Sequence, residues 1–241
     1  MQSTPQYRLA LANRILFRQG VVDAFGHVSL RDHAEPGRFF LSRNRAPALV
    51  RPEDIVSLNL DGTHATPDTR ASYLERYIHG EIYAARPDVM AVVHSHSPSV
   101  VPFGVVRGVP LRAVCHMCGF MGRSTPVFEI RDCAGDDTDL LITDRRLGKA
   151  LAEKLGADPL VLMRGHGSTV VGCDLEEAVY RAVYTEVNAR LQAEALRLGP
   201  VTYLSEGECR VSMQTMRGQH KRAWDHWSAL VAADLETGAS P

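Results

Sequence analysis

The chain has 241 residues and a mass of 26.5 kDa, and 45% of its residues are hydrophobic, which is typical of one globular domain with a sizeable core. Lysine and arginine number 27 against 28 aspartates and glutamates, and a formal net charge of −1 argues against a nucleic-acid partner. The apolar runs are shorter than the ~20 residues that cross a bilayer, and residues 1–8 show no export signal, so we expect no membrane partner.

The number of cysteines bears on the compartment. An odd count of five in a chain of this length argues against a disulfide framework and for a reducing environment, so we expect a cytoplasmic protein. The five residues are Cys115, Cys118, Cys133, Cys173 and Cys209.

The N-terminal quarter predicts one helix followed by strands. Apolar residues recur at helical spacing within Pro5–Arg18, and Gly20 supplies a stop. Short runs rich in β-branched and aromatic residues then alternate with turn residues, which predicts strands joined by turns. These runs are His27–Leu30, Arg38–Leu41 and Ile55–Leu60.

A helix and a buried strand follow. Ser72 is a candidate N-cap for a helix that runs to Ala85, and Pro87 ends it. The five apolar residues Val89–Val93 predict a buried strand that carries His94 at its carboxyl end.

The second half of the chain alternates between weak and strong patterns. Between residues 98 and 133 we expect short strands and loops. Asp144–Leu155 predicts a helix that Asp144 caps, and an apolar strand follows at Leu160–Met163. Asp174 caps a long helix that ends at Leu198, and a helical tail is expected at about 212–235. With no repeat, linker or low-complexity tract, we expect a single domain over the whole chain.

Three histidines suggest a metal site. His94 and His96 flank one serine at the end of a predicted strand, so both imidazoles project to the same side. Such a pair is also compatible with a merely polar strand end. His166, which lies between two glycines after another strand, is the natural third ligand. Three imidazoles leave coordination positions open, which is the arrangement of a catalytic site.

Glu75 is the fourth candidate. It falls in the first turns of a predicted helix that should pack beside the His94 strand. A carboxylate there can bind the ion or act as an acid or base, and the alternative is an ordinary solvated helix carboxylate.

In combination, four segments resemble the class II aldolase/adducin family, from the N-terminal helix to about Gly199. The segments are Glu75–His79, Ile82–Asp88, Val92–Pro98 and Arg164–Gly167. The resemblance implies a three-layer α/β/α sandwich around a largely antiparallel, nine-stranded sheet, and a homo-oligomer, usually a tetramer. It also implies a divalent ion that His94, His96 and His166 bind, and a catalytic glutamate at Glu75.

The chain departs from the sugar-phosphate aldolases of this family where they bind phosphate. Its corresponding segments read Gly26–Ser29, Leu41–Asn44 and Ser72–Glu75, with Arg43 and Leu74 in place of small residues. A phosphate cradle needs residues that let the anion approach the main chain, so these departures weaken the aldolase interpretation.

Other segments resemble the branch of the family that decarboxylates hydroxylated aromatic acids, such as dihydroxyphthalate and hydroxypyridine-dicarboxylate. They are Gly26–Ser29, Ser42–Pro47, Cys115–Met117 and Pro126–Arg131. The resemblance implies a lyase for a small aromatic acid that uses Mn, Zn, Fe or Co and no organic cofactor. Two alternatives stay open, an aldolase acting on a small hydroxy-carbonyl compound or sugar phosphate and a non-catalytic adducin-like module.

Roles within such a site can be assigned by residue type. Glu75 is the first candidate for the proton donor and His116 the second, although His116 could equally be a structural loop histidine. Substrate contacts are expected from His27 and Arg43, which can meet a carboxylate, and from the hydroxyls of Ser29 and Ser42. We interpret the Cys115/Cys118 pair as ordinary buried cysteines, because one CxxC without a second pair is weak evidence for zinc, and Trp224 and Trp227 as packing residues.

Overall fold

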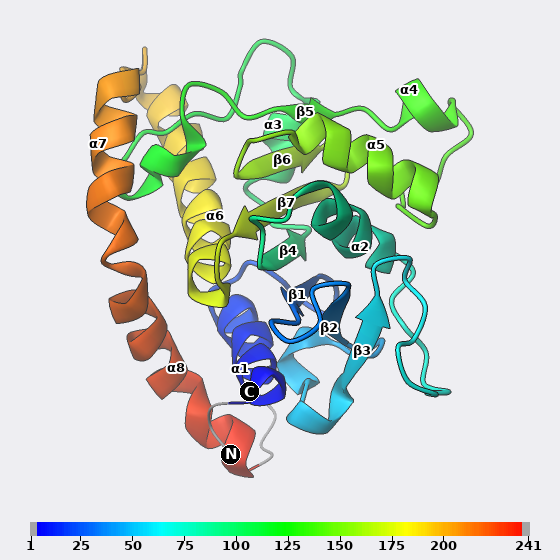
Figure 1. Cartoon of the computed structure of the whole chain (residues 1–241). Coiled ribbons are helices and arrows are strands. Elements are labelled where there is room, and N and C mark those ends of the chain that lie inside the picture. The colour runs from blue at the N-terminus through cyan, green and yellow to red at the C-terminus, as the bar shows by residue number, and fades with distance from the viewer. Residues whose placement is uncertain (1–3, 238–241) are drawn as a thin grey trace.

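The computed structural model describes residues 4–237 and has three layers, with a central sheet between two layers of helices (Figure 1). Within the described residues the sheet has seven strands in the order β3-β2-β1-β4-β7-β6-β5. The strands are β1 (His27–Arg31), β2 (Arg38–Ser42), β3 (Ile55–Asn59), β4 (Ala91–Ser95), β5 (Val127–Phe128), β6 (Leu160–Met163) and β7 (Gly167–Gly172).

The sheet is mixed. Strand β5 runs parallel to β6, whereas the five other pairings are antiparallel. The expectation of a largely antiparallel, nine-stranded sheet was therefore wrong. Within the described residues the sheet has seven strands and is mixed. The segment before β5 accounts for part of the difference, since residues 98–126 form short helices and loops instead of ladder-forming strands.

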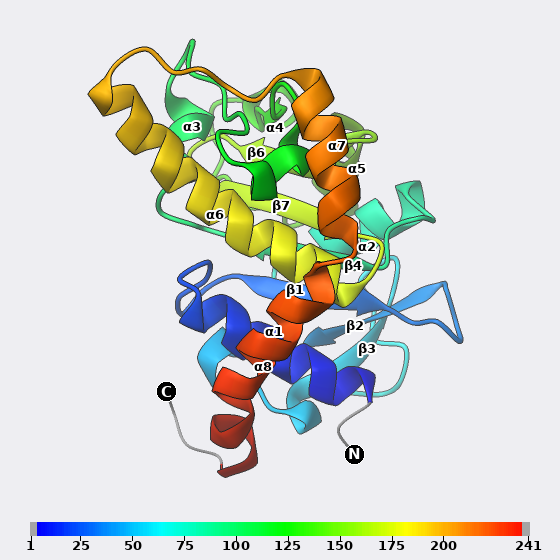
Figure 2. The same ribbon diagram turned by 90° about the vertical axis from the view of Figure 1, so that its left-hand side faces the viewer.

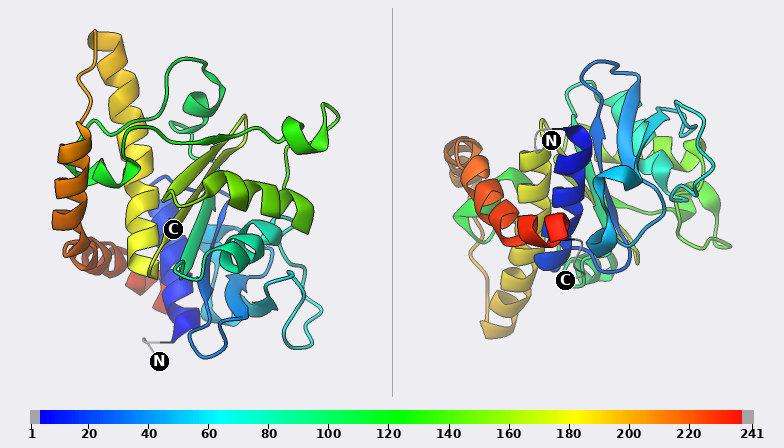
Figure 3. Two further views of the ribbon diagram at one scale, coloured as in Figure 1. Left: turned by 45° about the horizontal axis from the view of Figure 1, so that its top comes forward. Right: turned by 90° about the horizontal axis from the view of Figure 1, so that it is seen from below.

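Helices α1 and α6 cover one face of the sheet, with α7 and α8 on the same side, and α2 and α5 cover the other face. Figures 1 and 2 show α1, α6, α7 and α8 on one side, and Figure 3, seen from below, shows α1 and α6 next to the sheet with α8 outside them. Helices α2 and α5 lie on the opposite side (Figure 1). The longer helices are α1 (Pro5–Arg18), α2 (Arg76–Ala85), α5 (Arg145–Leu155), α6 (Leu175–Leu198), α7 (Glu206–Arg217) and α8 (His220–Thr237). The short ones are α3 (Val101–Val105), α4 (Arg131–Ala134), η1 (Pro47–Leu49), η2 (Pro52–Asp54) and η3 (His116–Met121).

Strand alternation separates two hydrophobic cores. On β4, Val93 belongs to the core under α1 and α6, whereas its neighbour Val92 belongs to the core under α2 and α5. Because successive strand side chains point to opposite faces, His94 shares the face of Val92 and points toward α2. On β1, Val28 packs under α1, so His27 and Ser29 also point toward α2.

The predicted helix caps are confirmed. The Asp144 carboxylate accepts a hydrogen bond from the Leu147 N–H, and the Asp174 carboxylate accepts one from the Glu177 N–H. Each bond satisfies a donor that the first helical turn leaves free. The helix predicted at Pro5–Arg18 has the predicted bounds, and Trp224 and Trp227 are buried in the core under α1 and α6, as packing residues are.

Three boundaries differ from the sequence expectations. Helix α2 begins at Arg76 because the Ser72 hydroxyl contacts the His64 ring instead of capping a helix, and Glu75 takes the N-cap position. Strand β4 is shifted to Ala91–Ser95, so His94 lies inside the strand. The tail at about 212–235 is two helices, α7 and α8, because α7 ends at Gly218.

None of the helices among residues 4–237 is both long enough and apolar enough to span a bilayer. The five cysteines are free thiols, of which Cys118 and Cys209 are buried and Cys173 is exposed.

Candidate metal centre

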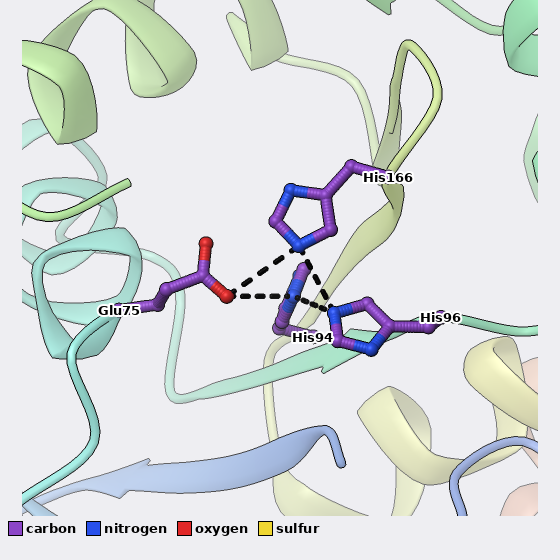
Figure 4. A group of neighbouring side chains, drawn as sticks. All are labelled: Glu75, His94, His96 and His166. Carbon is purple, nitrogen blue, oxygen red and sulfur yellow. Dashed lines mark hydrogen bonds and ion pairs between the residues drawn. The ribbon is translucent and has the colours of Figure 1, made fainter. Parts of the chain in front are cut away.

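Glu75, His94, His96 and His166 converge, with one ligand atom of each lying within 4.8 Å of all the others (Figure 4). The Nε2 atom of His96 is 3.1 Å from that of His94 and 3.0 Å from that of His166. The Oε2 atom of Glu75 is 3.5 Å from the Nε2 atoms of both His94 and His166. The four residues expected from the sequence are thus brought together.

Three elements and two glycines bring the ligands together. His94 lies on β4, His96 directly follows that strand, and Glu75 is at the N-terminus of α2. His166 occupies the turn between β6 and β7, where Gly165 has a φ of 67°, a conformation that glycine adopts without strain. At Gly167 an added Cβ would lie 2.0 Å from the Ser95 carbonyl oxygen, so only glycine allows the turn this close to β4.

A second set of contacts fixes the orientation of the ligands. The Nδ1 atom of His166 is 2.9 Å from the carbonyl oxygen of Leu140. Since a carbonyl can only accept, Nδ1 carries the proton and Nε2 presents a lone pair to the cluster. The Glu75 Oε1 atom accepts a hydrogen bond of 2.9 Å from the Ile142 N–H, which leaves Oε2 for the cluster. One short segment therefore positions ligands from two different elements.

His94 is held in a similar way. Its Nδ1 atom is 3.4 Å from the Thr169 hydroxyl, and that hydroxyl donates to the Met163 sulfur at 3.4 Å. Thr169 lies opposite His94 in the β4–β7 register, so sheet pairing itself supplies the partner. Partners of this kind set the tautomer of metal-binding histidines.

The donor set fits a divalent transition metal. Nitrogens about 2.0–2.1 Å from one ion are about 2.9–3.4 Å apart in octahedral or tetrahedral geometry, and the spacings of 3.0 and 3.1 Å fall in this range. Imidazole and carboxylate ligands suit borderline cations such as Zn, Fe, Co and Mn. Three or four protein ligands leave one or more positions for a substrate.

Burial and charge favour the ligand forms of these side chains. Desolvation, followed by the neighbouring His94 and His166, lowers the pKa of His96 to about 4. Burial raises the pKa of Glu75, but in the metal-free protein the protonated forms of His94 and His166, through charge and hydrogen bonds, outweigh burial and lower this pKa well below the ordinary value. Glu75 is therefore a carboxylate at neutral pH, and His96 is neutral, as metal binding requires.

His27 lies beside the four ligands, whereas the Ser29 hydroxyl is bonded within the protein. The His27 ring centroid is 5.0 Å from that of His94 and 4.6 Å from that of Tyr73. His27 Nδ1 is 2.6 Å from His79 Nε2, whose Nδ1 atom is 2.6 Å from the Ser29 hydroxyl. Ser29 is completely buried and its hydroxyl also contacts Tyr83 at 2.7 Å, so it is bonded within the protein instead of presenting a free hydroxyl.

Ser42 and Arg43 are the other two residues predicted to contact the substrate. The Ser42 hydroxyl is 3.1 Å from the hydroxyl of Tyr73, the residue whose ring packs on His27. Arg43 and Arg45 share one buried partner, since both guanidinium groups contact Asp54 Oδ1, at 2.7 and 3.3 Å. Two cations on one carboxylate leave a net positive charge around Asp54, which suits an anionic substrate.

His116 is placed elsewhere. Its side chain is exposed and lines a groove of about 690 Å³ between η3 and α7, outside the group of four ligands. The neighbouring thiols of Cys115 and Cys118 are 3.0 Å apart, and Cys118 is buried as expected whereas Cys115 is only partly buried. A role of His116 in the reaction stays a prediction.

Comparisons with known proteins agree with this architecture. Residues 7–193 match the model of the family described as Class II Aldolase and Adducin N-terminal domain. The protein named Decarboxylase tropJ from Talaromyces stipitatus is 38% identical, over 93% of this chain and 91% of its own length. A 3,4-dihydroxyphthalate decarboxylase from Arthrobacter keyseri is 28% identical, over 93% of both chains.

A solved structure shares the fold. The L-fuculose 1-phosphate aldolase from Glaciozyma antarctica superposes with a TM-score of 0.78, over 95% of this chain and 90% of that one, at 23% identity. This similarity confirms the α/β fold expected from the sequence.

Proposed function

Because the chain belongs to the class II aldolase and adducin family, we propose that it is a metal-dependent decarboxylase of a hydroxylated aromatic or heteroaromatic carboxylic acid. The convergence of three histidine nitrogens and one carboxylate with open coordination positions carries the proposal. The two relatives described above, both named as decarboxylases, support the choice of reaction. The ion is Mn, Zn, Fe or Co, no organic cofactor takes part, and the chain works in the cytoplasm as a homo-oligomer, the family's tetramer.

Glu75 moves the proton in this proposal. A bound divalent ion stabilises negative charge that develops on the substrate oxygens. The Glu75 carboxylate accepts the proton of the hydroxyl next to the carboxylate-bearing ring carbon, and then donates it to that carbon. The bond to the carboxylate breaks, carbon dioxide leaves, and the electron pair returns through the ring to the hydroxyl oxygen, which is protonated by solvent.

Arg43 and the surface around it hold the substrate carboxylates. The shared Asp54 neutralises only one of the two guanidinium charges of Arg43 and Arg45, and the second remains for an acidic substrate. The Tyr73 ring, which packs against His27 at a tilt of 40°, offers an aromatic surface suited to an aromatic ring.

The structure favours decarboxylation over sugar-phosphate cleavage. Leu74, at a position where a phosphate cradle needs a small polar residue, is 61% exposed and offers no donor. Arg43 puts a bulky side chain where the aldolases have a small residue, so an anion cannot approach the main chain closely there. A non-catalytic module would not need a carboxylate and three imidazoles oriented toward one point.

A carbon dioxide release assay tests the proposal. The protein is loaded separately with Mn, Zn, Fe and Co and given a panel of ortho-hydroxylated aromatic mono-acids and di-acids, with sugar phosphates as the comparison. We expect metal-dependent release from at least one hydroxylated acid. Efficient cleavage of a sugar phosphate without any carbon dioxide release would overturn the decarboxylase proposal, and metal-free protein as purified would favour the non-catalytic module.

A further inference from the structure

A buried chain of hydrogen bonds leads away from the metal centre. It runs from His27 to His79, from His79 to the Ser29 hydroxyl and from there to the Tyr83 hydroxyl, with distances of 2.6, 2.6 and 2.7 Å. The four side chains are between 0 and 4% exposed. A network this short and this deeply buried is costly unless each member has a donor matched to an acceptor.

Only two proton arrangements satisfy the chain. In the first, each group donates away from the metal centre, and His27 Nδ1 carries the proton. In the second, each group donates toward the metal centre, and His27 Nε2 carries it. The two differ in what the outward nitrogen of His27 offers, which is a lone pair in the first arrangement and an N–H in the second.

The two ends of the chain together favour the first arrangement. There the Tyr83 hydroxyl accepts from Ser29 and also reaches the carbonyl oxygen of Met90, which is 3.5 Å away and accepts from the Arg31 N–H as well. In the second arrangement Tyr83 donates to Ser29, the contact with Met90 is lost, and the His27 Nε2–H is a buried donor without a partner within residues 4–237. In the first arrangement Ser29 accepts from His79 Nδ1. His79 Nε2 is then left to accept from His27 Nδ1.

The outward nitrogen of His27 is available to a ligand. His27 is 4% exposed, and its Nε2 atom has no hydrogen-bond partner within residues 4–237. His27 pairs with His94 across the β1–β4 ladder and shares its face of the sheet, so this nitrogen lies beside the open side of the metal centre. A lone pair there accepts from a hydroxyl and repels a carboxylate.

We propose that His79, Ser29 and Tyr83 lock His27 in its Nδ1–H tautomer, so that its Nε2 atom accepts a hydrogen bond from a second substrate hydroxyl, distinct from the one that Glu75 deprotonates. The contact with a substrate hydroxyl rests on the proposed function, whereas the tautomer does not. His27 is then a specificity residue for polyhydroxylated acids, and His79 is a positioning residue. The earlier idea that His27 meets a substrate carboxylate is replaced by contact with a hydroxyl.

Nitrogen NMR tests the tautomer without any turnover. Zinc-loaded protein labelled with 15N-histidine is recorded by two-bond 15N–1H correlation, which separates protonated from unprotonated ring nitrogens, and the His27→Gln variant assigns the His27 signals. We expect a protonated Nδ1 and an unprotonated Nε2. The opposite pattern, or a mixture of both tautomers in the wild type, overturns the proposal.

Two variants of His79 test the lock. The amide oxygen of Gln in His79→Gln lies near the position of Nε2 and can accept from His27, so the Nδ1–H tautomer should persist. His79→Leu removes the acceptor, and both tautomers should appear. Tyr83→Phe removes the final donor and should give a partial mixture, which keeps the test decisive if the Leu variant does not fold. Unchanged spectra in both the Leu and Phe variants would contradict the lock.

Kinetics test the hydroxyl contact. An acid with two hydroxyls is compared with the analogue in which the second hydroxyl is replaced by hydrogen or methoxy. In the wild type and in His79→Gln the analogue should have a KM higher by on the order of tenfold, with a smaller change in kcat, as expected for one lost hydrogen bond. In His79→Leu this difference should largely disappear. Equal KM values in the wild type overturn the hydroxyl contact, and a protein that decarboxylates none of these acids overturns the proposed function and this contact together, while the spectrum still decides the tautomer.

Discussion

The His94–His96 segment and the Cys115–Cys118 segment both place two metal-binding side chains a short distance apart in sequence. Around the histidines, His166 and Glu75 arrive from other elements, and the second atoms of the ligands are held by Leu140, Ile142 and Thr169. Around the cysteines, the thiols contact each other and a backbone carbonyl. The side chain of His116, which lies between them, is exposed.

The difference teaches what turns a motif into a site. Two ligands on one segment are common, and they form a centre only where other segments supply further ligands and fix the proton on each ring. The predictions below test whether this support, and not the motif alone, makes the metal centre. They run from the largest expected effect to the smallest.

Loss of a ligand should have the largest effect. His94→Ala, His96→Ala and His166→Ala should each release the metal and abolish turnover while the protein stays folded, because two imidazoles hold a divalent ion far less tightly than three. Metal analysis by mass spectrometry and circular dichroism on the same preparations check this. Cys115→Ser is the matched control and should keep its full metal content. Full metal occupancy in any histidine variant would remove that residue from the ligand set.

Glu75→Gln separates the role of ligand from the role of proton carrier. The amide oxygen can still accept from the Ile142 N–H, so the metal should mostly remain, but the amide cannot transfer a proton. Activity should fall by roughly two to four orders of magnitude. Bound metal and initial rate are measured on the same sample. A parallel loss of both, rescued by excess metal, would make Glu75 chiefly a ligand, and retained activity would exclude Glu75 as the proton carrier.

Thr169→Val removes a supporting contact and no ligand. The substitution keeps the shape of a completely buried side chain but removes the hydroxyl next to His94 Nδ1. We expect metal affinity to fall by about tenfold, at the low end for loss of such a partner because the contact is long. Competition with a chelator measures the affinity. An unchanged affinity would show that the Thr169 hydroxyl is not needed to orient His94.

The buried His79 makes stability depend on pH. Burial, followed by the charge of His94, lowers the pKa of His79 to about 3. Between this pH and about 6.5 the unfolded chain binds a proton at His79 and the folded protein does not. Stability is therefore lost as pH falls from about 6.5 toward 3, by at most about 1.4 kcal/mol per pH unit for this group. Urea unfolding of the metal-free protein measures the slope. His79→Gln should have a shallower slope, and an identical slope in both proteins would exclude His79 as a contributor.

The sequence predicts the metal ligands better than the residues that form hydrogen bonds with those ligands. Spacing indicates the His94/His96 pair, the family resemblance adds His166 and Glu75, and Asp144 and Asp174 are recognisable by their positions before apolar helices. Local chemistry is sufficient for the caps and the chelating pair, because each acts within a few residues.

Long-range contacts explain the residues that the sequence missed. Leu140 and Ile142 act through backbone atoms, so their side chains carry no signal. Thr169, His79 and Tyr83 become partners only through strand register and helix packing. One missed boundary had a local signal, since Arg217 followed by Gly218 is a typical helix end and could have divided the tail.

Leu140 has a backbone φ of 69°, the one positive value at a non-glycine residue within residues 4–237. A leucine in this region costs of order 1 kcal/mol or more, and the bend aims the Leu140 carbonyl at His166 while the Ile142 N–H reaches Glu75. A designer who transplanted the four ligand side chains to another scaffold would leave this bend behind. The graft would have the right residues with two of them free to rotate, so copying the centre means copying residues 140–142 as a fifth component.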